Sequence, residues 1–386
     1  MSSLVWVELD SDAAESNLTE LRSCTPTDPL FCAVVKSNAY GHGVREMAGL
    51  LGSADWFAVN SLDEGLELRG FGVSKPILLL GHVPLNRLAE AVEADLRLTL
   101  YNDESLDVLS RLSGSDRKAM VHIKVETGTW RQGILPEQAV DFALKAMSIP
   151  KVELEGVSTH FANIEDTLNH DYAQRQLAEF QRALELLAEA GVNPPLKHTA
   201  CTAASILFPD THFSMLRAGI GLYGLWPSRE TYLSALTSGR PVPDLRPVMT
   251  WKTRIAQIKE VPEGSFVGYG CTHRTTRPTR IGVLPVGYAD GYRRALGNRA
   301  HVLIAGRRAP VLGRVCMNLV MVDITDVPDV QLEDEVVLLG GSGSEEVTAE
   351  MLAEWAGTIN YEVVTAVSPF LSRRVVNSAR AHQPER

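Results

Sequence analysis

The stretch FCAVVKSNAYGHG, residues 31–43, decides the fold of this chain. It opens as a continuous apolar run, which predicts a strand covered on both faces, as in a parallel sheet. The run ends at Lys36, and a tyrosine and a Gly-His-Gly turn follow it. A buried strand that ends on a lysine needs an explanation, because an ammonium group is costly to remove from water.

Seven similar runs follow, so eight strand candidates precede residue 225, with helical segments between them. The candidates are FCAVVK (31–36), WFAVN (56–60), PILLL (76–80), LRLTL (96–100), MVHIKV (120–125), LEGVST (154–159), LKHTA (196–200) and FSMLRAG (213–219). Eight strands that alternate with helices favour a (β/α)8 barrel. An open doubly wound sheet is the alternative, although no GxGxxG motif opens the first strand-to-helix turn.

Segments with the periodicity of amphipathic helices lie between these strands. One helix is expected to bury a face made of Val140, Leu144 and Met147. The clearest helix is YAQRQLAEFQRALELLAEAG (172–191), which we expect to end at Gly191 because glycine favours the left-handed conformation of a helix C-terminus.

The pattern changes after Trp226. Residues 227–247 are interpreted as a partly helical linker, and from Val248 short β-strand patterns alternate with turns that contain Pro, Gly and Asp. One late helix is predicted from about Thr348 to Thr365. We therefore expect a second, mainly antiparallel β domain.

Length, net charge and cysteine content exclude several classes of function. A chain of 386 residues is too long for one ordinary core, and a net charge of −10 argues against a nucleic-acid or anionic-membrane partner. The start MSSLVWVELD predicts no secretion signal, and no apolar run approaches the roughly 20 residues of a membrane span. Five scattered cysteines without a CxxC pair indicate free thiols, a reducing cytoplasm and no structural metal.

Lys36 lies where barrel enzymes place their active sites, at the C-terminal end of a strand. Burial lowers the pKa of a lysine and makes its amine a better nucleophile. Such an amine suits a Schiff base with a carbonyl, of either a substrate or pyridoxal phosphate. The alternative is a lysine that extends past the strand end into solvent.

Other strand ends favour the first interpretation. His160, His198 and Arg217 lie at or near the same end of the predicted barrel. The loops after strands seven and eight are the usual phosphate site of this architecture, and they offer Thr202 and the backbone N–H groups around Gly219 and Ile220. The glycines of this loop are ordinary turn residues in the alternative interpretation.

Six motifs in order resemble those of the alanine racemases, which are fold-type III pyridoxal-phosphate enzymes. They are AVVKSNAYGHG (33–43), KVETGTWRQG (124–133), VGYG (267–270), GYADGY (287–292), GRVCMN (313–318) and INYE (359–362). The resemblance covers nearly the whole chain. It implies a barrel domain, residues 11–235, that carries the cofactor, and a β domain made of residues 1–10 and 236–386.

The resemblance also implies roles. Lys36 would carry the cofactor and act as one base, and Tyr269 would act as the second base on the opposite face of the substrate. Arg217 would face the pyridine nitrogen and leave it unprotonated, because arginine keeps its proton. Arg131 and the backbone N–H of Met317 would hold the substrate carboxylate. The further cofactor contacts that the resemblance implies are Tyr40, His160, His198, Thr202, Gly219 and Ile220.

Weaker matches extend the site. Lys124 matches a position that is often carbamylated in the family, and a plain lysine in a salt bridge is the alternative. A substrate corridor would be lined by Tyr288, Arg294 and Arg314. In the family, Tyr269 and its neighbours reach the site from the other subunit, so the resemblance implies a head-to-tail homodimer with shared sites.

Four positions depart from the family pattern. The usual Asn-Ser pair is Cys201-Thr202, and Trp130 replaces a small or flexible residue. Asn318 replaces an aspartate, and Pro369 stands about where many members have a tyrosine. None of these is one of the two bases, so the departures bear on substrate preference and cofactor affinity.

The resulting hypothesis is a cytoplasmic enzyme that interconverts L- and D-alanine and supplies D-alanine for peptidoglycan. One alternative is a racemase of another amino acid, such as serine or lysine. A second is a decarboxylase of the same fold type, but the cysteine-aspartate pair of those enzymes is replaced here by CMN (316–318). A third is a non-enzymatic carrier built on the barrel alone, which would lack the second domain.

Overall fold

The computed structural model describes residues 4–25, 28–112 and 117–377. The chain divides into two compact units. The barrel unit comprises Glu15–Ala39 and Met47–Leu245, and the sheet unit comprises Met1–Ala14, Tyr40–Glu46 and Arg246–Arg386. Residues 1–3 and 378–386, which the expected β domain includes, lie outside the described residues.

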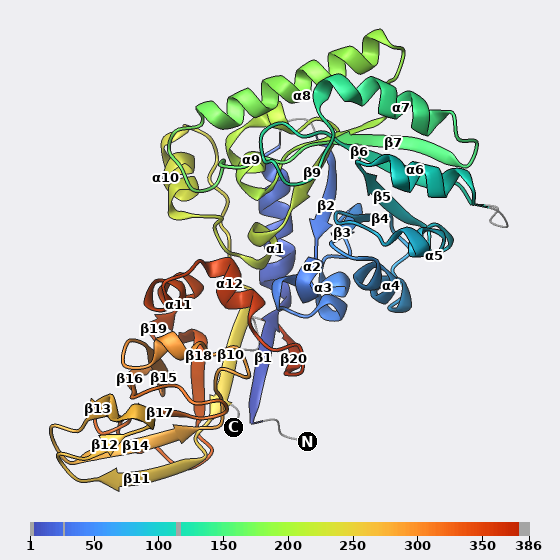
Figure 1. The fold of residues 1–386 in the computed structure, drawn as a ribbon. Coiled ribbons are helices and arrows are strands. Elements are labelled where there is room, and N and C mark those ends of the chain that lie inside the picture. The colour runs from blue at the N-terminus through green and yellow to red at the C-terminus, as the bar shows by residue number, and fades with distance from the viewer. Residues whose placement is uncertain (1–3, 26–27, 113–116, 378–386) are drawn as a thin grey trace. The chain divides into compact units, whose positions relative to one another are not determined.

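The barrel unit contains eight parallel strands in the order β8-β7-β6-β5-β4-β3-β2-β9 (Figure 1). They are β2 (Leu30–Val34), β3 (Trp56–Val59), β4 (Ile77–Leu79), β5 (Leu96–Leu100), β6 (Ala119–Lys124), β7 (Val152–Ser158), β8 (Leu196–His198) and β9 (Met215–Ala218). Two backbone hydrogen bonds, from Arg217 to Ala200 and from Ser214 to Lys197, link the ends of this row. The predicted barrel is therefore confirmed, as a nearly closed one.

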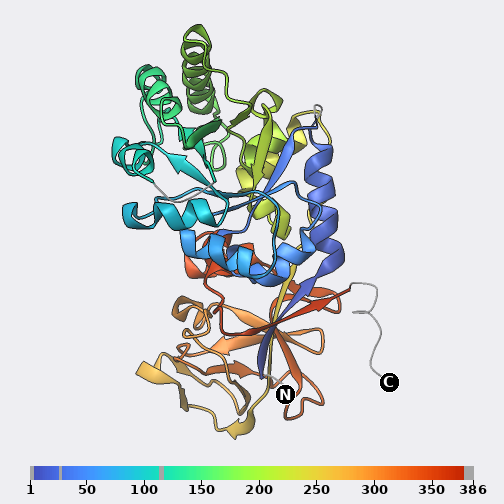
Figure 2. The same cartoon turned by 90° about the vertical axis from the view of Figure 1, so that its right-hand side faces the viewer.

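Helices surround these strands (Figure 2). The helices of the chain are α1 (Ser11–Ser23), α2 (Lys36–Tyr40), α3 (Val44–Leu50), α4 (Leu62–Gly70), α5 (Leu88–Glu93), α6 (Asp103–Ser110), α7 (Ala139–Met147), α8 (Asp171–Glu189), α9 (Thr202–Leu207), α10 (Arg229–Thr237), α11 (Ala349–Ala356) and α12 (Asn360–Thr365). Among the described helices, none combines the length and the apolar character that crossing a bilayer requires. Gly191 follows α8 with φ +76°, as expected for a helix stop.

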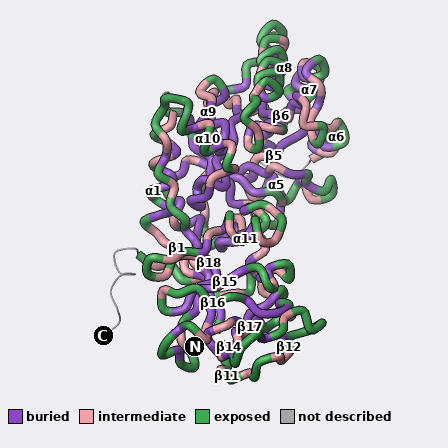
Figure 3. The backbone as a smooth tube through the Cα atoms, turned by 90° about the vertical axis from the view of Figure 1, so that its left-hand side faces the viewer, coloured by how far each residue is buried: buried purple, intermediate pink, exposed green. Residues whose placement is uncertain are grey.

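The buried face expected for α7 was wrong. Leu144 and Met147 are 46% and 51% exposed, and Phe142 packs inward together with Ala139, Ala143 and Ala146. The three alanines and Phe142 follow the same helical spacing as the predicted face, rotated around the helix. Alanine lets a helix lie close to a sheet, and here Leu144 and Met147 point outward. Figure 3 shows the buried strands enclosed by helices with exposed outer faces.

The sheet unit contains a ten-stranded sheet in the order β11-β14-β17-β16-β15-β18-β10-β1-β20, with β19 paired to β18, and the separate pair β12-β13. Its strands are β1 (Val5–Asp10), β10 (Met249–Arg254), β11 (Gln257–Val261), β12 (Phe266–Val267), β13 (His273–Arg274), β14 (Thr279–Leu284), β15 (His301–Ile304), β16 (Arg307–Leu312), β17 (Val320–Asp323), β18 (Glu335–Ser342), β19 (Glu345–Val347) and β20 (Ser372–Val376). Only β1 and β20 pair in parallel among the described strands of this unit, so the mainly antiparallel prediction is confirmed.

The single late helix predicted over Thr348–Thr365 is two helices, α11 and α12. Thr348 caps α11 by accepting the N–H of Met351 at 3.1 Å. Gly357 then adopts φ +73° and ends the helix, which a glycine does without steric cost.

Candidate active site

Lys36 opens a left-handed turn. The first barrel strand ends at Val34, so the prediction that Lys36 ends this strand was wrong by two residues. From Ser37 to Tyr40 the backbone has φ between 52° and 55°, and Gly41 has φ +81°. The N–H of Ala39 donates to the carbonyl of Val35 at 2.9 Å and closes one helical turn of the unusual hand.

Glu64 anchors the start of this turn. One carboxylate oxygen accepts the N–H of Ser37 at 2.5 Å, and the other accepts the N–H groups of Asn60 and Ser61 at 2.8 and 3.0 Å. Lys36 is half-buried, and burial, followed by the charge of Arg131, holds its pKa below the ordinary lysine value, against the opposing effect of Glu64. The amine of Lys36 is therefore easier to deprotonate than that of a solvent-exposed lysine.

Arg217 is buried within the barrel and is held by its two terminal nitrogens. Nη1 donates to Nδ1 of His198 at 2.5 Å and to the carbonyl of the same residue at 2.8 Å. Nη2 donates to the carbonyls of Thr159 and Thr199 at 2.8 and 3.1 Å. Within the described residues, no group accepts a hydrogen bond from its Nε. Burial lowers the pKa of Arg217 to about 10, which still leaves the side chain protonated at neutral pH.

The two predicted site histidines flank this guanidinium. His198 lies in β8, and His160 follows the end of β7 by two residues, with Nδ1 at 3.4 Å from Nη2 of Arg217. Burial lowers the pKa of both histidines well below the ordinary value, with added contributions from the charges of Arg217 and Lys124. Both rings are therefore neutral at pH 7.

The second motif, residues 124–133, forms a tight loop around a carboxylate. Glu126 accepts the N–H groups of Gly128 and Arg131 at 2.6 and 3.1 Å. Lys124 ends β6 beside it, and burial, followed by Arg217 and Arg131, lowers the pKa of Lys124 to about 7. A shallow pocket is lined by Lys124, Val125, Glu126, Thr129, Arg131, Gln132, Thr159 and His160. The structure thus brings Lys124, Arg131 and His160 together around this pocket.

Trp130 in this loop has φ +53° and is 76% exposed. A left-handed backbone favours glycine and asparagine over large residues, so the small or flexible residues usual in the family suit this position better. Nothing in the structure explains why a tryptophan stands here.

The predicted phosphate loops meet at one hydroxyl. Thr202, the first residue of α9, accepts the N–H groups of Gly219 and Gly221 at 3.0 and 3.4 Å through Oγ1. Ile220 begins the short 3-10 helix that follows β9. A Cβ on Gly221 would lie 2.6 Å from the methyl carbon of Thr202, so only glycine fits there. Cys201, which replaces an asparagine, is buried at the N-cap of α9 and leaves that cap without a side-chain hydrogen bond.

The remaining predicted residues lie in the sheet unit. Tyr269 and Met317 are 72% and 57% exposed, and Tyr288 is 43% exposed. The N–H of Tyr288 donates to the carbonyl of Cys316 at 3.1 Å, and the N–H of Ala289 donates to that of Met317 at 3.0 Å. The fourth and fifth motifs are therefore neighbours.

Arg314 and Arg294 complete this group in different ways. A Cβ on Gly270 would lie 2.7 Å from a guanidinium nitrogen of Arg314, so the Arg314 side chain lies against the residue after Tyr269. Arg294 begins a short 3-10 helix, and its carbonyl accepts the N–H of Gly297. Gly297 in turn packs on the carbonyl of Gly313, just before Arg314.

Tyr40 belongs to the sheet unit, where its ring centroid lies 6.1 Å from that of Tyr361 in the sixth motif. Its neighbour Gly41 packs directly against a backbone carbonyl, since an added Cβ would lie 1.9 Å from the oxygen of Val364. Glycine is therefore required at 41 both by its positive φ and by this close approach.

Comparisons with known proteins agree with this arrangement. Residues 9–227 match the family model "Alanine racemase, N-terminal domain", and residues 248–375 match "Alanine racemase, C-terminal domain". The chain belongs to the alanine racemase family. An alanine racemase of Halothermothrix orenii is 40% identical over 375 residues, which cover 96% of this chain and 97% of that protein. One of Symbiobacterium thermophilum is 41% identical, and the alignment covers 94% of each chain.

Solved structures of alanine racemases show the same fold. The enzyme of Clostridium difficile 630 has a TM-score of 0.89 at 34% identity and covers 98% of this chain and 97% of its own. That of Bacillus anthracis with bound L-Ala-P has a TM-score of 0.90 at 36% identity, with the same coverage. Both the family resemblance and the predicted fold class are thereby confirmed.

The sequence reasoning missed three polar residues of this racemase-family barrel: Glu64, Glu126 and His122. Ser61 and Glu64 have the spacing of a capping box, which is visible in the sequence, but the reach of Glu64 to Ser37 is not. His122 lies inside the barrel with its Nδ1 at 2.7 Å from Nε2 of His198.

Proposed function

We propose that this protein is a pyridoxal-phosphate-dependent alanine racemase that uses Lys36 and Tyr269 as its two bases. The observation that carries the proposal is that one barrel holds both a half-buried Lys36, whose pKa is lowered, and a buried Arg217, in a chain matched over both alanine racemase domains. Both the reaction class and the residue roles follow from the family resemblance, and the geometry of the residues is consistent with them.

The residues fit this cofactor. Arg217 uses both terminal nitrogens on protein acceptors, so Nε–H is the donor that it offers to a pyridine nitrogen. Lys36 supplies an amine for the carbonyl carbon of the cofactor. The hydroxyl of Thr202 and the N–H of Ile220 supply donors that a phosphate needs, and Gly219, whose own N–H donates to Oγ1 of Thr202, would contact the phosphate beside them. We assign Tyr40 to the same end. When bound, pyridoxal phosphate withdraws electrons from Cα of the amino acid and makes its hydrogen acidic.

The chain's own groups then move protons. The amine of Lys36 takes the Cα proton from one face, and the phenol of Tyr269 returns a proton to the other, or the reverse. Arg131 and the N–H of Met317 bind the substrate carboxylate and orient Cα between the bases. Arg217 donates to the ring nitrogen without transferring its proton, which limits how much negative charge the ring can take and so disfavours side reactions.

We also propose that Lys124 carries a carbamate. Among the described residues Lys124 makes no ion pair within 4.0 Å, which weighs against the salt-bridged alternative. Carbamylation needs the neutral amine, and a pKa lowered to about 7 makes that form abundant at neutral pH. The resulting anion would orient the guanidinium of Arg131.

The exposure of Tyr269 and Met317 supports a head-to-tail homodimer in which each site takes these two residues from the other subunit. Tyr288, Arg294 and Arg314 would line the substrate corridor of that shared site. We place the enzyme in the cytoplasm, where D-alanine would feed peptidoglycan synthesis. We also propose the domain division made from the sequence: a barrel domain, residues 11–235, that carries the cofactor, and a β domain, residues 1–10 and 236–386, that supplies the second base.

The test is a chiral assay of purified protein with pyridoxal phosphate, started separately from L-alanine and from D-alanine. Convergence of both reactions on an equal mixture supports the proposal. Absence of turnover on alanine, with turnover on serine or lysine, would assign the protein to another substrate. Release of carbon dioxide from an amino acid would instead indicate the decarboxylase alternative.

A further inference from the structure

Behind His198, away from Arg217, the barrel interior holds a second buried histidine and a carboxylate. His122 of β6 lies with Nδ1 at 2.7 Å from Nε2 of His198 and Nε2 at 3.1 Å from Oε2 of Glu155. His122 is fully buried, and the Glu155 side chain is 14% exposed. Together with the contact between His198 and Arg217, these make an unbroken row from a carboxylate to a guanidinium, Glu155–His122–His198–Arg217.

The two ends of the row fix where its protons lie. A carboxylate only accepts, so Nε2 of His122 carries a proton and Nδ1 is bare. Nε2 of His198 must then donate to that bare nitrogen, which leaves Nδ1 of His198 bare for the guanidinium, which only donates. Burial holds the pKa of both rings below the ordinary value, so each ring carries one proton. All three hydrogen bonds therefore point toward Glu155.

A β-bulge brings Glu155 into this row. In the pairing of β6 with β7, Val121 lies opposite Leu154 but His122 lies opposite Gly156, so Glu155 is an extra residue in β7. A bulge of this kind turns its extra side chain toward the residue that it faces. Gly156 makes room for the imidazole, because a Cβ there would lie 2.3 Å from Nδ1 of His122.

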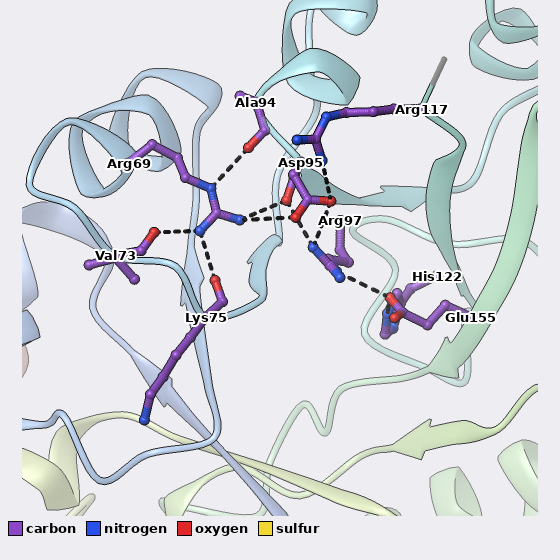
Figure 4. Close-up of polar contacts among 9 residues, drawn as sticks. All are labelled: Arg69, Val73, Lys75, Ala94, Asp95, Arg97, Arg117, His122 and Glu155. Carbon is purple, nitrogen blue, oxygen red and sulfur yellow. Dashed lines mark hydrogen bonds and ion pairs between the residues drawn. The ribbon is translucent and has the colours of Figure 1, made fainter. Parts of the chain in front are cut away.

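Charged groups on and around β5, the strand next to β6, lie at the carboxylate end of the row (Figure 4). Nε of Arg97 lies 3.6 Å from Oε2 of Glu155, and Nη1 of Arg97 lies 3.1 Å from Asp95. Asp95 is also approached by Arg69 and Arg117 at 3.9 and 3.5 Å. Arg97 therefore lies between the carboxylates of Glu155 and Asp95, where the row meets a group of ion pairs.

We propose that Glu155 and His122 are positioning residues, which act through His198 to fix the orientation of Arg217 and so the direction in which its Nε–H is presented to the cofactor ring. The inference rests on the proposed function. It adds to that function a role for Glu155 and His122, which lie on the side of His198 that faces away from Arg217. Neither residue touches the substrate in this scheme.

The first test is nitrogen NMR of the full-length protein labelled with 15N-histidine, with and without pyridoxal phosphate. The variants H122N and H198N assign the two signals. The expected wild-type spectrum has both rings neutral, protonated at Nε2 and bare at Nδ1. Protonation of His198 at Nδ1 would overturn the proposal, and this measurement requires no variant at Glu155.

The second test compares E155Q with E153Q. Glu153 lies on the same strand but forms an ion pair with Lys118 at 3.2 Å and is half-exposed, so it serves as the matched control. E155Q should shift the ring-nitrogen signals of both His122 and His198, because a neutral amide accepts less strongly and also donates. E153Q should leave them in place. Unchanged signals in E155Q would contradict the proposal.

Kinetics give an independent outcome. In E155Q we expect kcat for alanine to fall by about tenfold, the loss expected when a hydrogen bond to a charged group weakens, with KM within about twofold because Arg131 is untouched. The absorption of the bound cofactor should also shift.

If wild-type protein fails to racemise alanine, the proposed function fails, while the NMR of the cofactor-free chain still decides the proton arrangement. Normal kcat in E155Q would reject the positioning role alone.

Discussion

The Nη2 atom of Arg217 lies 3.4 Å from Nδ1 of His160. Nη2 donates its two hydrogens to the carbonyls of Thr159 and Thr199, and a guanidinium nitrogen does not accept, so the Nδ1 that faces it is bare and His160 carries its proton on Nε2. Its lowered pKa keeps that ring neutral. His160 can therefore offer a neutral N–H to a phenol oxygen, and in the proposed dimer this phenol is that of Tyr269.

Replacing Tyr269 by Phe tests the second base. Tyr269→Phe should slow removal of the Cα proton from one enantiomer far more than from the other, by about a hundredfold or more, since general-base catalysis contributes that much. Solvent-deuterium exchange of L- and D-alanine, measured separately by NMR, gives the two rates. Equal losses for both enantiomers would count against two bases.

Lys36→Ala should abolish covalent attachment of the cofactor. The wild-type chain, treated with borohydride in the presence of pyridoxal phosphate, should retain the cofactor after denaturation, because borohydride would reduce the proposed bond between the Lys36 amine and the carbonyl carbon of the cofactor. Lys145→Ala is the control, since Lys145 forms ion pairs with Asp103 and Asp107 at the surface. Mass spectrometry detects the label. Retained label in the Lys36 variant would show that another lysine carries the cofactor.

Arg131→Lys should raise KM for alanine by about tenfold, because a lysine cannot form the paired hydrogen bonds of a guanidinium with a carboxylate. Initial-rate kinetics with alanine measure the change. Arg182→Lys is a suitable control, since Arg182 pairs with Glu137 and Glu179 on the outside of the barrel. An unchanged KM in the Arg131 variant would remove this residue from the carboxylate site.

Lys124 should make stability depend on pH. Its pKa is lowered to about 7 in the folded chain, so between pH 7 and the ordinary lysine value of 10.5 the unfolded chain binds more protons than the folded one. Stability from this residue therefore rises with pH across that window, by at most about 1.4 kcal/mol per pH unit. Below pH 7 both states are protonated and the slope vanishes.

Lys124→Met should remove this rise. Urea unfolding of both proteins at pH 7 and pH 9, in carbonate-free buffer, measures it. The wild-type protein should gain more stability than the variant between the two pH values. The same pH dependence in both proteins would show that Lys124 titrates normally. In buffer with 13C-bicarbonate, a carbamate signal present in wild type and absent in the variant would support carbamylation.

Much of the fold was predictable because the barrel strands are continuous apolar runs. Each of the eight predicted runs overlaps an observed strand, and Trp226 marks the change to the β-rich half. The predictions were wrong where small residues determine which helix face is buried or where a helix ends. The alanines of α7 replaced the expected buried face, and Gly357 split one late helix into two. The spacing of apolar residues alone does not show how closely a helix packs on a sheet or where the backbone adopts a left-handed conformation.

The site was less predictable than the fold. Lys36, His160, His198 and Arg217 could be singled out because strand ends of a barrel face one mouth. The hydrogen bonds among them could not be predicted. The sequence does not reveal the one-residue bulge in β7 either, so Glu155 was not singled out. Tyr269 and Met317 were found only through motif resemblance, because no periodicity connects them with the barrel.

The left-handed turn after Lys36 has the hand that mirror-image amino acids prefer. Each L-residue in it costs about 1 kcal/mol or more relative to the ordinary helix, and four such residues precede Gly41. A semisynthetic chain with D-alanine at Ala39 should form this turn without that cost and unfold at a higher urea concentration. Conversely, a mutational scan should find β-branched residues at Asn38 and Ala39 to be the worst tolerated substitutions in α2.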